Sequence, residues 1–513
     1  MKNDMLSVGL DIGTTKVVVM VGRRKEDSTV EIIGVGQSPS TGVSKGAIQN
    51  ISKTISAIRQ AVEMAEEASG VKINEVTVGI AGQYIRSARQ TDYITRPNPE
   101  RVIDQDDLDR LRVQVEKAAP HSEHEQIIHV LPQEYKVDAE GGILEPIGMY
   151  GQRLEATFHI VIGQVAPLLN VKRCVEGAGL KLAGLKLEPI ASSDSTLTEE
   201  EKEAGVVLVD IGGGTTDLVI VRDNLVRYSA VIPYGGKVLT NDIKDACAIL
   251  SRYAEKLKKE FGSTWPGANL DTDIVSIPVI QGLPPKEISA KTLSRIIHAR
   301  MDELLDDINS ELANYRQVEP GKSLIAGVVI TGGGALLKHM PQFVIFKTQM
   351  SCRIGYPNIY LSDENRECLT SPMYSTCIGL VLNGLKDMEP SADEEENETS
   401  AGGAVAEYSL QGIGEKDAVE LPLEDVIPAI KVNVAAKTAD EDAYSYQSDE
   451  EIMKMDAVAE DSEEDIEKYI RASEAQQQEK QPDPVKTKPV KKTKQGWDKR
   501  IEKTIYDFLK KIE

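Results

Sequence analysis

The chain has 513 residues, 41% of them hydrophobic, and a formal net charge of −23 at pH 7. This length exceeds what one hydrophobic core usually organises, so we expect more than one domain. Residues 387–480 hold 28 Asp and Glu against 7 Lys and Arg, which leaves residues 1–386 with a net charge of only about −7. Such mild acidity in the folded part argues against a nucleic-acid partner.

The five cysteines are widely spaced and form no CxxC pair, which fits reduced thiols in a cytosol. Three of the six histidines fall within residues 121–129, but their spacing fits no common zinc pattern. No segment approaches the ~18 apolar residues of a membrane span, and the first residues lack a signal-peptide core. We therefore expect a protein that is neither exported nor transmembrane.

Two similar stretches open the chain's two parts: "VGLDIGTTKVVVMVG" at residues 8–22 and "VLVDIGGGTTDLVIV" at residues 207–221. In each, an apolar run leads through an aspartate and a glycine turn into a second β-branched run that is too short for a helix. The pattern predicts two β-hairpins.

Other elements follow the usual periodicities. Residues 51–68 predict a helix, residues 75–82 a strand, residues 106–118 a short helix, residues 240–262 and 289–315 two long helices, and residues 327–341 a strand followed by a glycine turn. Alternation of this kind indicates an α/β fold. From residue 387 to about 495 no period persists, so this segment predicts a disordered linker, acidic first and basic later.

A glycine hairpin can hold phosphate, because glycines let backbone N–H groups approach oxygen atoms closely. Asp11 and Asp210, at the strand ends, are suited to holding Mg²⁺ through water, and Lys16 supplies a compact positive charge. Two facing hairpins would then clamp a polyphosphate. For one hairpin alone, an ordinary tight turn explains the sequence equally well; the pair, with a third turn at "TGGGALL", favours the clamp.

These three turns, in this order, resemble the actin-like ATPase superfamily, which implies a duplicated fold around ATP. The resemblance assigns the first phosphate motif to Asp11, Gly13, Thr14, Thr15 and Lys16, the second to Asp210, Gly212, Gly213, Gly214, Thr215 and Thr216, and the adenosine motif to Gly332, Gly333 and Gly334. It also implies Glu188 as the residue that orients the attacking water, and Glu255 and Lys258 as nucleoside contacts. From the residues alone, Glu188 reads as a capping or solvated side chain, and the other two as a surface ion pair.

Within that superfamily the chain is similar to the FtsA family of bacterial cell division actins. The stretches "VTVGIAGQYIRS", "HVLPQEYKVDAEGGILEPIGMYGQRLEATFHIV" and "PYGGKVLTNDIKDAC" carry this similarity. The expected organisation is a first half (1–83 and 165–194), an inserted subdomain (84–164), a second half (195–237 and 321–386) with a helical subdomain (238–320), a linker (387–495) and a C-terminal helix (496–513).

The resemblance further implies self-assembly into filaments, contacts with other division proteins, and binding of the FtsZ C-terminal tail by the helical subdomain. There Arg295, His298 and Arg300, with Lys291, are basic residues on one predicted helix, suited to an acidic peptide. A solvated helix face is the alternative for each of them.

Residues 496–513 predict an amphipathic helix. Its apolar stripe comprises Trp497, Ile501, Ile505, Phe508, Leu509 and Ile512, and its basic side includes Lys499, Arg500 and Lys510. Five lysines precede it, which favours anionic lipids at the cytoplasmic face of the inner membrane, the place that the resemblance also implies. Docking onto a partner or onto the protein's own core would use the same stripe.

The sequence thus predicts an ATP- and Mg²⁺-binding protein that tethers FtsZ filaments to the membrane at the division site, with slow ATP turnover at most. An actin-like scaffold of a pilus or secretion system, or a small-molecule kinase of the same superfamily, are the alternatives. The long acidic linker would hold the body of the protein off the membrane, or act as an inert tether.

Overall fold

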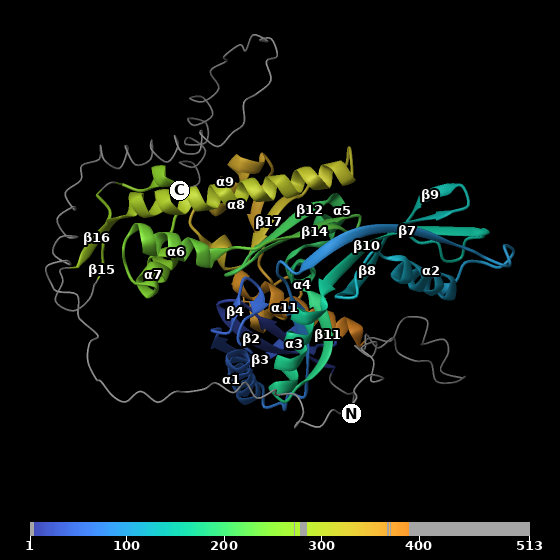
Figure 1. The fold of residues 1–513 in the computed structure, drawn as a ribbon, viewed down its shortest axis with the longest axis horizontal. Coiled ribbons are helices and arrows are strands. Elements are labelled where there is room, and N and C mark those ends of the chain that lie inside the picture. Colours follow the sequence, from blue (N-terminus) through green and yellow to red (C-terminus); the bar gives the residue numbers. More distant parts are fainter. Residues whose placement is uncertain (1–4, 271, 278–284, 367–368, 370, 389–513) are drawn as a thin grey trace, which may run out of the picture. The chain divides into compact units, whose positions relative to one another are not determined.

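The computed structural model describes residues 5–270, 272–277, 285–366, 369 and 371–388 (Figure 1). The linker from residue 389 and the predicted amphipathic helix over residues 496–513, with its apolar stripe and basic side, lie outside the described residues. Among the helices that are described, none is both long enough and apolar enough to cross a membrane.

The first half is built on a five-stranded sheet with the order β11-β6-β1-β2-β3. Its strands are β1 (Leu6–Ile12), β2 (Lys16–Arg24), β3 (Val30–Pro39), β6 (Glu75–Ile80) and β11 (Lys181–Leu187). β1, β2 and β3 run antiparallel, whereas β6 and β11 join parallel to β1. The strands β4 (Val43–Ser44) and β5 (Ala47–Ile48) form a separate short pair.

The second half repeats this topology. Its sheet has the order β14-β13-β12-β17-β18, with the strands β12 (Val206–Ile211), β13 (Thr216–Arg222), β14 (Leu225–Ile232), β17 (Gly327–Thr331) and β18 (Cys352–Ile354). Again an antiparallel three-stranded meander is extended by two parallel strands. Both predicted hairpins are confirmed, as β1–β2 (the first hairpin) and β12–β13 (the second hairpin), and the α/β duplication follows from the identical strand orders.

Helices complete the two halves. They are α1 (Ile51–Ser69), α3 (Val165–Gly177), α4 (Glu188–Thr196), α5 (Glu199–Ala204), α9 (Met340–Thr348), α10 (Asp363–Arg366) and α11 (Ser375–Asp387), with short 3-10 turns η2 (Gly333–Leu336) and η3 (Pro372–Tyr374). The helix predicted over residues 51–68 is confirmed as α1. The Asn50 side chain caps its start by accepting from the Lys53 N–H, and left-handed Gly70 ends it.

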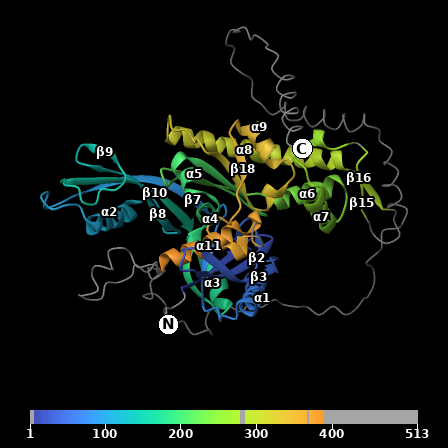
Figure 2. The same ribbon diagram turned by 180° about the vertical axis from the view of Figure 1, so that it is seen from behind.

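The helices α4 and α11 cross in direct backbone contact, and both views of the fold place them side by side (Figure 2). A Cβ atom on Gly379 of α11 would lie 1.8 Å from the carbonyl oxygen of Ala191 in α4, so only glycine permits this approach. Since α4 follows the first sheet and α11 ends the second half, the crossing joins the two halves.

The inserted subdomain, hereafter the insert, has its own four-stranded antiparallel sheet of order β7-β10-β8-β9. Its elements are β7 (Ile85–Thr95), α2 (Gln105–Ala118), β8 (Glu125–Val137), β9 (Glu140–Ile143) and β10 (Arg153–Gln164). The short helix predicted near residues 106–118 is confirmed as α2, whose Leu111 and Val115 are buried in the same core as Phe158. The insert contacts the second half, where His159 Nε2 lies 3.0 Å from Ser229 Oγ.

The helical subdomain departs from the sequence prediction. The single helix expected over residues 240–262 is wrong, because the chain forms α6 (Gly236–Ala246) and α7 (Ser251–Phe261) with a break between them. At the break Ala248 adopts a left-handed conformation with φ +44°, and Ile249 is buried in the core of the second half. Both helices are amphipathic, so the apolar residues of the two together resembled the spacing of one continuous helix.

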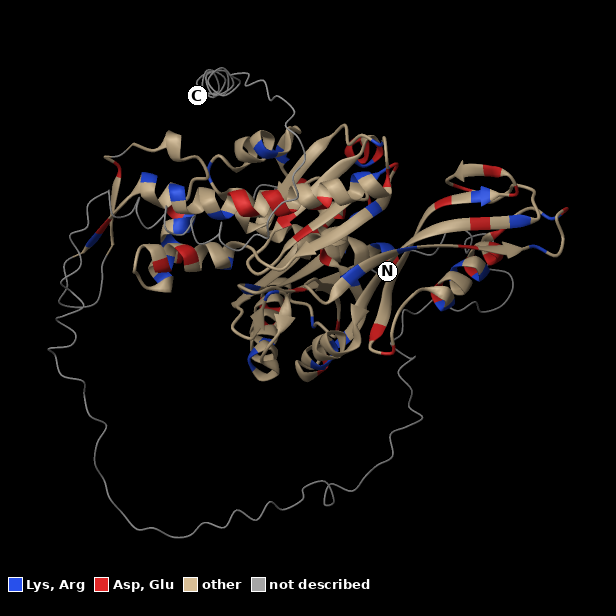
Figure 3. Ribbon diagram, turned by 45° about the horizontal axis from the view of Figure 1, so that its top comes forward, with Lys and Arg blue, Asp and Glu red and all other residues tan. Residues whose placement is uncertain are grey.

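The second long helix is confirmed as α8 (Ala290–Val318), which buries the stripe Leu293, Ile297, Met301, Leu304, Ile308 and Leu312. η1 (Pro266–Ala268) and the paired strands β15 (Ile274–Ile277) and β16 (Lys286–Ser289) complete this subdomain. Acidic and basic residues are interspersed along α8 and over the other described elements (Figure 3).

Candidate functional site

The turns of the two hairpins face each other at close range. A Cβ atom on Gly214 would lie 2.1 Å from Thr14 Oγ1, and one on Gly213 would lie 2.5 Å from Thr15 Cγ2. Two glycines of the second hairpin are therefore required because the first hairpin occupies the space of a side chain. The facing arrangement predicted from the sequence is confirmed.

Backbone donors line this junction. The carbonyl groups of Gly212 and Gly213 accept from the N–H groups of Gly236 and Lys237, so the start of α6 anchors the second turn. Among the described residues, the N–H groups of Gly213 and Gly214 have no hydrogen-bond acceptor, and the same holds for those of Thr14 and Thr15. Unpaired N–H groups in two glycine turns are what an anion such as phosphate requires.

The threonines differ in their availability. Thr15 is exposed, whereas Thr14 and Thr215 are buried, and Thr14 Oγ1 accepts from the Gly46 N–H at 3.3 Å. Thr216, also predicted as a phosphate contact, donates its hydroxyl to the Tyr234 carbonyl at 3.0 Å and is fully buried. Its hydroxyl is thus already bonded within the second half.

Asp11 is the next-to-last residue of β1 and is only 8% exposed. Burial raises the pKa of its carboxyl group to about 6, with Lys16 acting to lower it and Asp210 to raise it. Lys16 Nζ donates to the Met373 carbonyl at 2.7 Å and lies 4.4 Å from the centre of the Tyr374 ring. Burial also lowers the pKa of this lysine. The first hairpin therefore brings a carboxylate and a cation to the junction.

Asp210 is the next-to-last residue of β12 and is equally buried, but it has different partners. Its Oδ2 atom accepts hydrogen bonds from Ser192 Oγ at 2.7 Å and Thr376 Oγ1 at 3.2 Å. Burial raises the pKa of Asp210, while these hydroxyl groups act against the shift. Two buried carboxylates on facing turns, with Lys16 as the cation that acts on both, form an oxygen-rich site that fits a divalent cation held through water.

Asp217 was not anticipated from the sequence. It lies directly opposite Asp210 in the second hairpin, is 3% exposed, and accepts from Thr215 Oγ1 at 2.9 Å. Its Oδ1 atom has no hydrogen-bond partner in the part of the chain that the structure describes. Burial is the main cause that raises the pKa of Asp217 to about 8, and the negative charge of Asp210 is the second. The available signal was a charged residue inside the run "TDLVIV", whose other five residues are apolar or carry a hydroxyl group.

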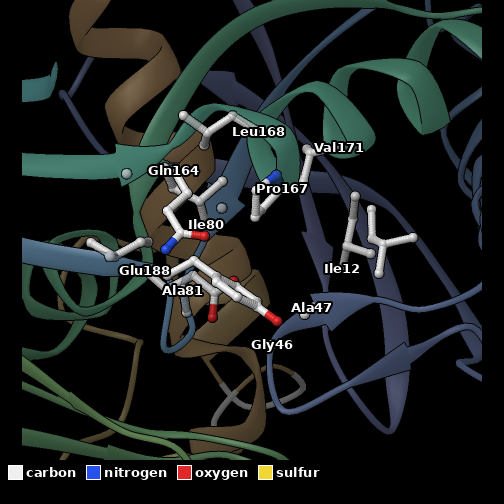
Figure 4. Close-up of a pocket in the computed structure, with 15 residues that line it drawn as sticks. Ile12, Gly46, Ala47, Ile80, Ala81, Gln164, Pro167, Leu168, Val171 and Glu188 are labelled. Carbon is white, nitrogen blue, oxygen red and sulfur yellow. The ribbon is translucent and has the colours of Figure 1, made fainter. Parts of the chain in front are cut away.

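Glu188 is the first residue of α4 and lines a small cavity of about 40 Å³ with Gln164, Tyr84 and Ile12 (Figure 4). Burial, and then the charge of Asp11, hold the pKa of Glu188 well above its usual value. The cavity is too small for a nucleotide, which needs several hundred Å³. The charges that act on Glu188 are those of the hairpin aspartates Asp11, Asp217 and Asp210.

The third glycine turn closes onto the second hairpin. Gly332 has φ +79°, and a Cβ atom there would lie 2.3 Å from Asp210 Oδ1; a Cβ atom on Gly334 would meet Ile211 at 2.3 Å. Gly333 begins η2 beside Met373. The predicted adenosine motif is thus in contact with the second phosphate motif.

Glu255 and Lys258 form an ion pair of 2.7 Å on α7. Lys258 Nζ also donates to the Gly236 carbonyl at 2.8 Å and to Thr240 Oγ1 at 2.7 Å, which ties α7 to α6. The pair is partly buried and bonded across two helices, so it is more than an i,i+3 contact on one helix surface. An isolated backbone β-bridge between Ser263 and Lys338 links the end of α7 to the chain after η2.

The residues predicted to bind an acidic peptide differ in their surroundings. His298 Nδ1 lies 2.8 Å from the Thr264 carbonyl oxygen, and its ring stacks on Phe343 at 4.5 Å between centres. Arg300 is paired with Asp242 at 2.6 Å. Arg295 is exposed, and Lys291 is half-buried at the start of α8.

Comparison with known proteins supports one family. The chain is 36% identical over 381 residues to the cell division protein FtsA of Pseudomonas aeruginosa, covering 74% of this chain and 89% of that protein. It is 35% identical over 399 residues to the cell division protein FtsA of Escherichia coli K12, covering 75% of this chain and 93% of that protein. The chain belongs to the FtsA family.

Family models agree with this assignment. The model described as cell division protein FtsA matches residues 207–379, and the model of the SHS2 domain inserted in FtsA matches residues 82–162. A PilM-PilN type IV pilus biogenesis complex aligns with a TM-score of 0.55 at 16% identity, covering 75% of this chain and 99% of that chain, a likeness in fold alone. This FtsA-family chain therefore has the duplicated actin-like fold, and its relatives are cell division proteins.

Proposed function

We propose that this protein binds ATP with Mg²⁺, assembles into filaments, and attaches FtsZ polymers to the cytoplasmic face of the inner membrane at the division site, where later division proteins join. The observation that carries the nucleotide part is the pair of facing glycine turns, whose N–H groups have no acceptor among the described residues, flanked by buried Asp11 and Asp210. The carboxyl groups of the two aspartates complement a cation, and the N–H groups of the turns complement a polyphosphate.

In this proposal the turn N–H groups and Lys16 bind the phosphates, and Asp11 and Asp210 hold the cation through water. The bound Mg²⁺ would neutralise phosphate charge. The adenosine would lie near Gly332–Gly334 and the Glu255–Lys258 pair, on the side where α7 and the third turn are joined. Glu188, with its raised pKa and its place next to the phosphate turns, is the residue that would orient water in slow hydrolysis.

The structural likeness to a pilus biogenesis complex leaves a scaffold for a pilus as the second candidate. Family membership, including the FtsA-type insert, favours the cell division role. A small-molecule kinase of the same fold would leave that insert without a role.

Attachment to the membrane would use residues 496–513, whose six apolar side chains occupy one stripe of an ideal helix. The FtsZ tail would bind near the start of α8, where Arg295 is exposed. His298 would then contribute by shaping the surface, since its ring packs on Phe343.

The membrane part is tested with the full chain and vesicles of anionic phospholipid. Phe508→Glu places a charge in the apolar stripe, whereas Tyr506→Glu adds the same charge on the opposite side of the helix. We expect Phe508→Glu to abolish co-sedimentation with vesicles and Tyr506→Glu to retain it. Equal pelleting of the two variants would exclude a membrane-inserted stripe. Adding FtsZ then measures tethering: only the vesicle-binding variants should bring FtsZ polymers into the pellet.

A further inference from the structure

Asp210 is held from two helices that belong to different parts of the chain. Ser192 on α4 and Thr376 on α11 both donate to its Oδ2 atom, and their hydroxyl oxygens are 3.1 Å apart. Ser192 is fully buried and Thr376 is 8% exposed. A carboxylate oxygen that accepts two buried hydroxyl donors cannot rotate without breaking both bonds.

The other carboxylate oxygen is left for a ligand. Among the described residues, Asp210 Oδ1 accepts no hydrogen bond, and it lies where the missing side chain of Gly332 would be, 2.3 Å from the position of a Cβ atom. The hydroxyl pair therefore fixes which oxygen faces the glycine turns. In the described part of the chain no hydroxyl group donates to Asp11, and the opposite charge that acts on Asp11 is that of Lys16.

The two donors also lie on the helix crossing that joins the halves. Close beside them, Ser195 Oγ donates to the Ser375 carbonyl at 2.7 Å, and Gly379 contacts Ala191. A shift of α4 along α11 would separate Ser192 from Thr376, and Asp210 would lose one of its donors. Whether Asp210 keeps both hydrogen bonds thus depends on the relative position of α4 and α11.

We propose that Ser192 and Thr376 are positioning residues for the cation: they orient Asp210 so that Oδ1 accepts from a Mg²⁺-bound water, and they make this orientation depend on the α4–α11 crossing. The proposal rests on the proposed Mg²⁺–ATP site. It assigns a role in ligand binding to two hydroxyl groups that would not themselves touch the nucleotide.

The test measures ATP binding to the full chain by calorimetry, once with Mg²⁺ and once with EDTA. Ser192→Ala and the isosteric Thr376→Val remove only the hydroxyl groups. We expect each to weaken ATP binding about tenfold with Mg²⁺, the order of a hydrogen bond to a charged group, and less than twofold in EDTA. Thr376→Ser, which keeps the hydroxyl, should retain the wild-type Mg²⁺ dependence.

Ser193→Ala is the matched control, because this buried neighbour on α4 donates to the Ile190 carbonyl and not to Asp210. Thermal unfolding of each variant without nucleotide reports purely structural damage. Equal weakening in Mg²⁺ and EDTA, or an unchanged Mg²⁺ enhancement in both hydroxyl variants, would overturn the positioning role while leaving the nucleotide site intact. A wild-type chain whose ATP affinity ignored Mg²⁺ would overturn the proposed cation site itself, and the positioning role with it.

Discussion

The two hairpins have the same strand topology and similar sequences, yet their aspartates are held in different ways. In the first hairpin, the charge of Lys16, five positions further along the chain, acts on Asp11, and apolar Val18 lies directly opposite Asp11. Asp210 of the second hairpin is fixed by two hydroxyl groups and has Asp217 opposite. The two hairpins therefore share a motif but differ in chemistry. The first supplies the positively charged Lys16, and the second supplies Asp210 as an oriented carboxylate.

The difference comes from what packs behind each strand. α4 and α11 bring Ser192 and Thr376 to the second hairpin, whereas the first hairpin receives the carbonyl of Met373 and the ring of Tyr374 against its lysine. Four predictions test this difference between the two hairpins.

The largest effect is expected from Lys16→Ala. Removing the only lysine of the two turns should weaken ATP binding about a hundredfold, because a charge-assisted contact to phosphate is lost, and the loss should be similar with Mg²⁺ and in EDTA. Calorimetric titration under both conditions measures this. Lys53→Ala, on exposed α1 surface, is the control. A loss confined to Mg²⁺ would mean that Lys16 acts on the cation site instead.

Asp210→Asn should weaken ATP binding about thirtyfold in Mg²⁺ and little in EDTA, since it removes charge from the cation site but not from the phosphate donors. Asp11→Asn should have the same sign but a smaller effect, because Asp11 lacks the hydroxyl groups that orient Asp210. The same titrations compare the two. An Asp11 effect as large as that of Asp210 would show that orientation by hydroxyl groups adds nothing.

Gly214→Ala should weaken ATP binding about tenfold, because its Cβ atom would collide with Thr14 Oγ1 and push the facing turns apart. Gly13→Ala should perturb only its own turn, where the nearest atom is the Lys16 carbonyl oxygen at 2.9 Å. Gly184→Ala, with open space around its Cβ position, is the control. If Gly214→Ala binds ATP like the control, the turns do not act as one clamp.

The smallest effect concerns pH. The pKa of Asp217 is raised from 3.8 to about 8, so the folded state keeps a proton that the unfolded chain releases, and this contribution to stability is lost as pH rises from about 4 through 8. Asp217→Asn, which cannot ionise, should therefore raise the Tm by ~2–4 °C at pH 8.5 and by less at pH 5. Thermal unfolding in EDTA without nucleotide provides the measurement. A Tm difference independent of pH would assign the effect to lost packing rather than to ionisation.

Several features could be predicted from the sequence because they depend on local patterns. Alternating β-branched runs around glycine turns predicted the two hairpins, and apolar spacing predicted α1, α2 and α8. The break between α6 and α7 could not be read, because it depends on Ala248 taking a left-handed conformation so that Ile249 reaches the core. His298 looked like a surface base and instead stacks on Phe343, which is 45 residues away in the sequence.

The glycine turns, their duplication and the family could be inferred from the sequence, since each motif consists of residues close together along the chain. The surroundings of the two aspartates, in contrast, arise from the tertiary fold. Ser192, Asp210 and Thr376 are up to 184 positions apart, and no local pattern marks the two hydroxyl groups among the chain's many serines and threonines. They meet because Gly379 lets α4 and α11 approach to backbone contact. Burial then strengthens each hydrogen bond to the carboxylate, because the protein interior has a low dielectric constant.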